Sequence, residues 1–253
     1  LAKALKIDVE SLTSTELMKQ LAPVGVLLQS NFLNELPLDL FGIELSKVTE
    51  IIANAPIRVG AFISTLVEIS RSYALLDAHF FTGAMRAYQE MRYNYFEEIE
   101  KAVDDFFKKD KLPFNGTTNS DNLKLILQKK YKYQVIENGL SEFPELKDIR
   151  AVFIPKRKKL LLNENLSSAE KLFQLAKELG FNRLKIKQRG YTSSLLKIDS
   201  FDMVLNQFQA SYFAAALIIP REALLEDLTS FFQKERWDAE ALIQINQKYN
   251  ASP

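Results

Sequence analysis

The sequence predicts an α+β fold that is mainly helical, in which a helical N-terminal domain is followed by a domain with a small sheet. The helical prediction rests on apolar residues that recur in steps of three and four from Glu16 to Phe107. The sheet prediction rests on two short strand-like runs, at 149–154 and 160–163, which are joined by a turn at 155–158. Helical periodicity then returns and continues towards the end of the chain.

The first part of the chain is expected to contain a helix from Glu44 to about Ala55, a second that begins at Pro56, and a long third from about Ala78 to Lys108. Proline suits a first helical turn because the N–H that it lacks has no partner there. The third helix carries an apolar stripe formed by Phe81, Ala84, Tyr88, Met91, Tyr95, Ile99, Ala102 and Phe106. Its other face pairs acids with bases four residues later, which is typical of a solvated surface.

Residues 110–119 are rich in turn-forming and polar residues and are expected to link two domains. After the linker we expect a helix over 122–131, a strand over 133–137, the strand pair, a helix around 175–181, and helices over 201–219, 221–234 and 238–249. The predicted segments are therefore an N-terminal piece (1–12), a helical domain (13–109), the linker (110–119) and a small-sheet domain (120–253).

The composition excludes several kinds of site. The chain has 253 residues, a net charge of +1, no cysteine and a single histidine, His79. Disulfides and thiolate metal sites are therefore excluded, and no histidine-based zinc site or Ser-His triad can form without His79. No apolar run is long enough to span a membrane, so we expect a cytoplasmic protein without a membrane partner. Because Leu1 is not a start methionine, the sequence is expected to be part of a longer chain.

Residues 175–181 read Leu-Ala-Lys-Glu-Leu-Gly-Phe, which has the spacing of a zinc peptidase helix without its metal ligands. In the H-E-x-x-H motif, two histidines at i and i+4 bind zinc from one helical face, and the glutamate acts as general base. Lys177 and Phe181 stand at the histidine positions, and Glu178 stands at the base position. A lysine cation and a phenyl ring cannot bind zinc, so we expect no metal and no cofactor.

The order of two strands, this helix, and then a helix with Phe-Ala-Ala-Ala-Leu-Ile-Ile-Pro at 213–220 resembles the ImmA/IrrE-type metallopeptidase domain, which has a zincin-like fold. The resemblance implies a carboxylate near the start of the second helix as the third metal ligand. The matching residue is Gln209, a neutral amide that binds zinc poorly. The resemblance therefore implies a pseudopeptidase in which Lys177, Glu178, Phe181 and Gln209 are a vestigial motif, and not an enzyme.

Residues 1–12, which begin Leu-Ala-Lys-Ala-Leu-Lys-Ile, resemble the tail of an Xre-type helix-turn-helix domain, although the end of any amphipathic helix explains them equally well. Together with the helical region and the ImmA/IrrE-like module, they resemble bacterial transcription regulators that respond to short-chain fatty acyl-CoA. The resemblance implies an effector-sensing and dimerisation region. It also implies a homodimer that binds DNA through a helix-turn-helix domain mostly missing from this chain.

The helical region contains more aromatic residues than one stripe requires, so we predict a pocket there for an apolar or acyl ligand, such as an acyl-CoA or a fatty acid. The apolar part would contact Tyr73, Phe80, Phe81, Tyr88 and Tyr95, and an anionic group would bind Arg71 and Arg86. Core packing of the aromatics and an ion pair of Arg86 with Glu90 are the alternatives. Two other functions also stay open, a protein-interaction scaffold and a peptidase whose metal is held by residues outside the motif.

Overall fold

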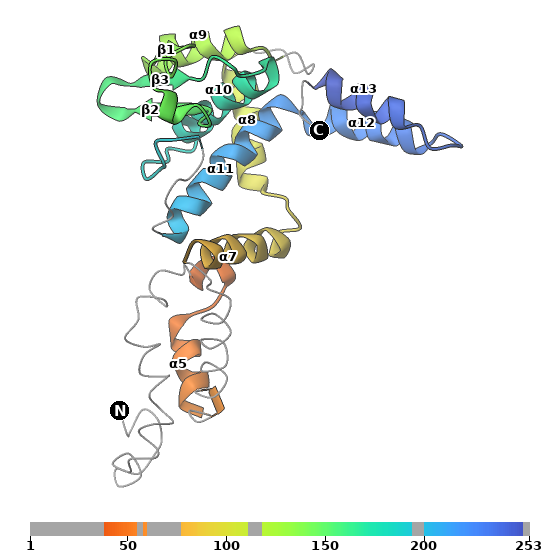
Figure 1. The fold of residues 1–253 in the computed structure, drawn as a ribbon. Coiled ribbons are helices and arrows are strands. Elements are labelled where there is room, and N and C mark those ends of the chain that lie inside the picture. Colours follow the sequence, from red (N-terminus) through yellow and green to blue (C-terminus); the bar gives the residue numbers. More distant parts are fainter. Residues whose placement is uncertain (1–37, 55–57, 60–76, 111–117, 194–199, 250–253) are drawn as a thin grey trace. The chain divides into compact units, whose positions relative to one another are not determined.

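The structure, a computed structural model, describes residues 38–54, 58–59, 77–110, 118–193 and 200–249 (Figure 1). The described part contains eight α-helices and a three-stranded sheet, which confirms the mainly helical α+β fold class. The chain divides into two compact units, residues 1–94 with 198–201, and residues 95–197 with 202–253. The four segments predicted from the sequence stay a prediction, because the first segment and most of the linker lie outside the described residues.

The first unit contains the 3-10 helix η1 (Leu38–Phe41) and the helices α5 (Leu45–Asn54) and α7 (Asp77–Met91). Helix α5 confirms the helix predicted from Glu44, whereas the helix predicted from Pro56 falls mostly outside the described residues. One face of α7 is buried, and its core residues are Phe81, Met85 and Tyr88. Their spacing of four and three residues places them on one side of the helix.

The prediction of one long helix from Ala78 to Lys108 is wrong. Helix α7 ends at Met91, and α8 (Glu97–Asp110) begins after a break. Tyr93 and Asn94 adopt left-handed conformations with φ of 51° and 55°, which close the helix. The backbone N–H of Phe96 then donates to the hydroxyl of Tyr212, at 3.3 Å, in place of a helical hydrogen bond. The apolar stripe continues across the break, so the spacing alone gives no sign of it.

The sheet of the second unit has the order β1-β3-β2, with β1 at Gln134–Ile136, β2 at Ala151–Ile154 and β3 at Lys159–Leu162. The central strand β3 is antiparallel to β2 and parallel to β1. All three strands confirm the prediction. The turn between β2 and β3 forms a short 3-10 helix, η3 (Pro155–Arg157).

Residues 191–193 pair with the outer edge of β2. The N–H of Phe153 donates to the carbonyl of Tyr191 at 2.7 Å, and the N–H of Ser193 donates to the carbonyl of Ala151 at 2.8 Å. This pairing satisfies backbone groups that an edge strand would otherwise expose. It also fixes the segment before Ser193 close to the helix that carries the vestigial motif.

That helix is α10 (Ser168–Arg183), the most deeply buried helix of the second unit. Its first turn is fixed by a capping box, because Ser167 and Glu170 each accept a hydrogen bond from the other's backbone N–H. Every residue from Gln174 to Phe181 is buried. Helix α9 (Ser120–Tyr131) packs against α10 and contacts β1.

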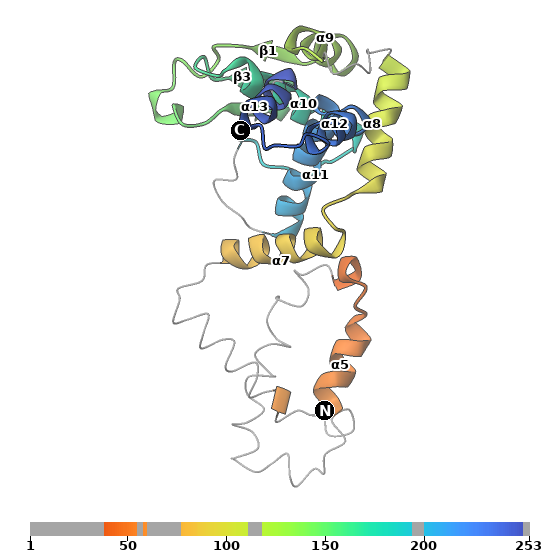
Figure 2. The same ribbon diagram turned by 90° about the vertical axis from the view of Figure 1, so that its right-hand side faces the viewer.

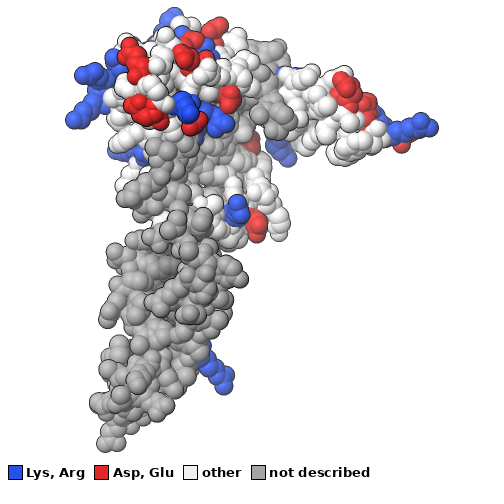
Figure 3. Space-filling model, viewed as in Figure 1, with Lys and Arg blue, Asp and Glu red and all other residues white. Residues whose placement is uncertain are grey.

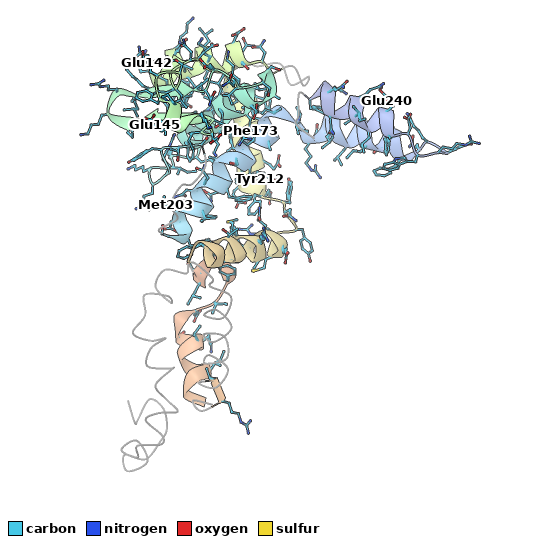
Figure 4. The ribbon with its side chains drawn as sticks, viewed as in Figure 1. Glu142, Glu145, Phe173, Met203, Tyr212 and Glu240 are labelled. Atoms are coloured by element: carbon cyan, nitrogen blue, oxygen red, sulfur yellow. The ribbon has the colours of Figure 1, made fainter. Side chains whose placement is uncertain are left out.

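Helices α8, α10 and α11 (Phe201–Ile218) lie side by side in both views (Figures 1 and 2). The rings of Phe106 on α8 and Phe213 on α11 meet edge to face, with centroids 6.1 Å apart. Tyr212, labelled in Figure 4, donates from its hydroxyl to Glu100 of α8 at 2.7 Å. These contacts join the three helices into the main core of the unit.

The chain ends in a helical hairpin of α12 (Arg221–Phe232) and α13 (Ala239–Lys248). Asp238 caps α13, and Asp227 of α12 accepts hydrogen bonds from Lys248 at 2.7 Å and from Tyr249 at 2.6 Å. No helix in the described ranges has both the length and the apolar character needed to cross a membrane.

Gly180 allows α10 and α11 to approach closely. A Cβ at this position would lie 2.9 Å from the carbonyl oxygen of Ala210 and 3.2 Å from its Cα, and neither atom can rotate away. We expect Gly180→Ala to be less stable than the control Gly83→Ala by about 1–3 kcal/mol in urea unfolding. Gly83 also lies in a helix but has open space around it, so the gain in helix propensity cancels between the two variants. Equal stabilities would contradict the close approach.

Candidate functional site

The candidate site is the buried face of α10 between the β2 edge and α11. Gln174, Lys177, Glu178 and Phe181 are three or four residues apart, so they share this face. All four side chains are buried, although three of them are polar or charged. Buried polar groups need partners, and the neighbouring segments provide some of them.

Glu178 forms a buried ion pair with Arg189. The guanidinium donates two hydrogen bonds to the two carboxylate oxygens, from Nη1 at 2.9 Å and from Nη2 at 2.5 Å. Both side chains are more than 90% buried. The guanidinium also lies 3.9 Å from the ring centroid of Phe181 and 4.2 Å from that of Phe153. This bidentate, stacked arrangement is the geometry that arginine favours for a desolvated pair.

Tyr133 completes the surroundings of Glu178. Its hydroxyl donates to the carboxylate at 3.1 Å and accepts a hydrogen bond from the Asn182 side chain at 2.9 Å. Burial, together with the nearby carboxylate, raises the pKa of the Tyr133 hydroxyl to about 12. The hydroxyl therefore keeps its proton at neutral pH, and both oxygens of Glu178 accept hydrogen bonds from side chains of the chain itself.

Lys177 is also buried, but its hydrogen-bond partner is a backbone carbonyl and not a charged side chain. Its ammonium donates to the carbonyl of Ser193 at 3.1 Å, and the same carbonyl accepts a hydrogen bond from Gln207 at 2.9 Å. In the described part of the chain no carboxylate forms an ion pair with it. Burial lowers the pKa of the Lys177 amine to about 8, whereas the charge of Glu178 acts in the opposite direction.

A cavity of about 390 Å³ opens beside Lys177. Its polar lining consists of Arg150, Glu170, Gln174, Lys177 and Ser193, and its apolar lining consists of Ala169, Phe173, Ala215, Ile218 and Ile219. In contrast, the space enclosed between Lys177, Glu178 and Arg189 is only about 10 Å³, which is too small for more than about one water molecule. Lys177 therefore borders the larger cavity, whereas the partners of Glu178, Tyr133 and Arg189, border a separate hollow of about 220 Å³.

The zinc ion that the resemblance implies does not fit these residues. Lys177 and Phe181 offer no metal-binding lone pair at the two ligand positions, and Gln209, half-buried on α11, offers a neutral amide. The Arg189 guanidinium binds Glu178, the residue at the general-base position. Across the described ranges, no group of three or more His, Cys, Asp or Glu side chains could hold a metal ion.

The structure places two of the predicted ligand-binding residues in the core of the first unit. Phe81 and Tyr88 are both buried on α7, and the ring of Phe41 meets that of Tyr88 edge to face at 6.1 Å. Arg86 lies on the exposed side of the same helix. The two aromatic rings therefore pack on protein, as the core-packing alternative expects, and their role in ligand binding stays a prediction.

The grouping of the other predicted ligand residues with these is not tested. Tyr95 belongs to the second unit, where the guanidinium of Arg221 lies 5.5 Å from its ring centroid. Phe80 lies in α7, but its side chain is outside the description, and Arg71 and Tyr73 lie outside the described residues. The predicted pocket in the helical region therefore stays a prediction.

The partners of Glu178, Arg189 and Tyr133, were not predicted from the sequence. These residues lie outside any periodic stripe, in segments that only the folded chain brings to α10. One physical argument could have indicated them. A glutamate in an apolar stretch of helix requires a cation or several donors once it is buried.

Comparisons with known proteins agree with the domain expected from the motif. Residues 133–253 match the Peptidase_M78 family, described as the IrrE N-terminal-like domain. No curated protein matches the chain. Among solved structures, the chain is similar to a Mycobacterium tuberculosis transcriptional regulator at 16% identity and a TM-score of 0.48, over 66% of this chain and 47% of that one. The chain thus spans about half the length of that protein. The residues that match this family include the whole sheet and the helices α10 to α13.

Proposed function

We propose that this chain is the effector-sensing and dimerisation region of a bacterial transcription regulator, and that its IrrE-like domain is a pseudopeptidase. The buried ion pair of Glu178 with Arg189 is the observation that supports the pseudopeptidase. The sensing and dimerisation role is supported by the order of the helical region and the IrrE-like domain along the chain, because this order resembles that of such regulators. Acidic and basic side chains are intermixed on the face shown in Figure 3, and the proposal assigns DNA contact to a helix-turn-helix domain outside this chain.

The ion pair supports a role without catalysis for a chemical reason. A general base needs a lone pair that faces the reacting proton. Both oxygens of Glu178 are occupied by Arg189, and one also accepts from Tyr133. Because Arg189 and Tyr133 both donate hydrogen bonds to this carboxylate, they hold it in a structural role rather than a catalytic one. The same contacts fix α10 to the segment around Arg189.

A protein-interaction scaffold is the second candidate, because the α12–α13 hairpin exposes large apolar side chains. Phe232 and Trp237 are each more than 70% exposed, and Leu225 and Ile243 are about half exposed. Exposed apolar groups that cluster in this way often mark a protein contact. This surface is compatible with a regulator that also binds a second protein.

Metal analysis of the purified chain tests the pseudopeptidase. After dialysis against zinc and removal of unbound metal, we expect no stoichiometric zinc and no cleavage of peptide substrates. The same measurement on Glu178→Gln provides the comparison, because it leaves the residues at the former histidine positions in place. One zinc per wild-type chain, or peptide cleavage that Glu178→Gln abolishes, would contradict the pseudopeptidase.

A further inference from the structure

The cavity beside Lys177 has the size and lining of a small-molecule site. Its volume of about 390 Å³ lies within the usual range for ligand pockets, roughly 300–1,000 Å³. One wall is apolar and comes from Phe173 of α10, labelled in Figure 4, and from Ala215 and Ile218 near the end of α11. Two buried polar side chains of α10, Gln174 and Lys177, line the same cavity. An apolar wall and adjacent hydrogen-bond donors suit a ligand with one apolar end and one end that accepts hydrogen bonds.

The charges around the cavity do not balance. Arg150 pairs with Glu170 at 3.0 Å, and Arg189 pairs with Glu178. Lys177 is the third cation near the cavity, and among the described residues it has no acidic partner. An ammonium has three N–H donors, and the Ser193 carbonyl accepts one of them. The cavity therefore has an excess of one positive charge and donors that face its interior.

We propose that this cavity binds a small carboxylate with an apolar body. The carboxylate accepts hydrogen bonds from Lys177 and Gln174, and the apolar body lies along the α11 wall. The inference deepens the proposed function, on which it rests, because it places the effector in the IrrE-like domain. It names a different site from the pocket predicted in the helical region.

The geometry favours a carboxylate over a phosphate. One uncompensated cation and one amide match a single negative charge, whereas phosphate sites usually gather several cations or backbone N–H donors. The guanidinium of Arg150 at the cavity is already paired with Glu170. The apolar wall adds affinity for the body of the ligand, by about fourfold for each buried methylene.

Calorimetric titration with straight-chain carboxylates from butanoate to decanoate tests the site in the complete 253-residue chain. We expect the affinity to rise about fourfold per methylene until the cavity is full. Lys177→Met should weaken octanoate binding by about tenfold or more, because the charged hydrogen bond is lost. The matched control Lys156→Met, on the exposed turn after β2, should bind octanoate like the wild type. Octan-1-ol should bind wild type and Lys177→Met equally.

A second variant keeps the test valid if Lys177→Met alters the fold. Ala215 is exposed and lines the cavity, so Ala215→Phe narrows it without disturbing the core. This variant should reject octanoate and decanoate more strongly than butanoate, while its circular dichroism matches that of the wild type. Lys177→Met tests the carboxylate end of the ligand, and Ala215→Phe tests its apolar end.

Three outcomes would overturn the inference. These are no binding by any carboxylate, equal octanoate binding by wild type and Lys177→Met, and tighter binding of inorganic phosphate than of octanoate. The zinc measurement separates this inference from the pseudopeptidase. A zinc-free protein that binds no carboxylate refutes only the ligand site, whereas a protein that binds both zinc and octanoate refutes only the pseudopeptidase.

Discussion

Arg189→Met is expected to lower the free energy of unfolding by about 3–5 kcal/mol. The variant leaves the carboxylate of Glu178 buried, and Tyr133 is then the one hydrogen-bond donor to its side chain among the described contacts. The loss of one partner from a buried ion pair costs far more than the pair contributes, because the remaining charge is neither paired nor hydrated. Urea unfolding at pH 7, followed by circular dichroism, measures the change.

Two further variants show whether the cost comes from the unpaired charge. Arg157→Met, on the exposed turn after β2, removes the same charge and should change stability by less than about 0.5 kcal/mol. The double variant Arg189→Met with Glu178→Gln should recover part of the loss, because no uncompensated charge remains. A loss below about 1 kcal/mol for Arg189→Met would show that the ion pair is not buried as described.

Lys177→Met is expected to stabilise the protein at pH 7, and this advantage should disappear as the pH rises towards 10.5. Burial lowers the pKa of Lys177 from an ordinary value of 10.5 to about 8 in the folded protein. Below pH 8 the amine is protonated in both states, so the wild type bears the full cost of the buried charge. Between these pKa values the unfolded wild type binds more protons than the folded form, so its stability rises with pH.

The expected change in the stability difference between variant and wild type is about 3 kcal/mol from pH 7 to pH 10.5. Urea unfolding of both proteins at several pH values measures it. Other groups that titrate in this range, such as Tyr133, are present in both proteins and cancel in the difference. Lys156→Met, which removes an exposed lysine, should show a difference that hardly changes with pH. If the stability difference between Lys177→Met and the wild type also stayed constant with pH, the Lys177 amine would be hydrated in the folded state.

Most of the regular elements could be predicted from the sequence because each is encoded locally. Helix α10 has a capping box and an apolar face, and β2 and β3 are apolar runs around a proline turn. The end of α7 could not be predicted in the same way. The apolar stripe continues through the break, where Tyr93 and Asn94 are left-handed and donate back to the carbonyls of Glu90 and Gln89, although neither residue is a glycine that would signal a helix end.

The candidate site could be predicted only in part, for a related reason. The spacing of Lys177, Glu178 and Phe181 identifies the vestigial motif, because all three residues share one helix. Arg189 reaches Glu178 only because residues 191–193 pair with the edge of β2. The cavity depends on how α11 packs beside α10. Pairing along a strand edge and packing of helices join residues that no local pattern connects.

The parallel pairing of β1 with β3 delays the completion of the sheet during folding. Strands β2 and β3 are joined by one short turn and can pair early, whereas β1 must wait until residues 137–158 have closed a much longer loop. Residues 191–193 can add to β2 only after that strand has formed. We therefore expect Arg189 to reach Glu178 late, so that Glu178 loses its water together with the arrival of the cation that neutralises it.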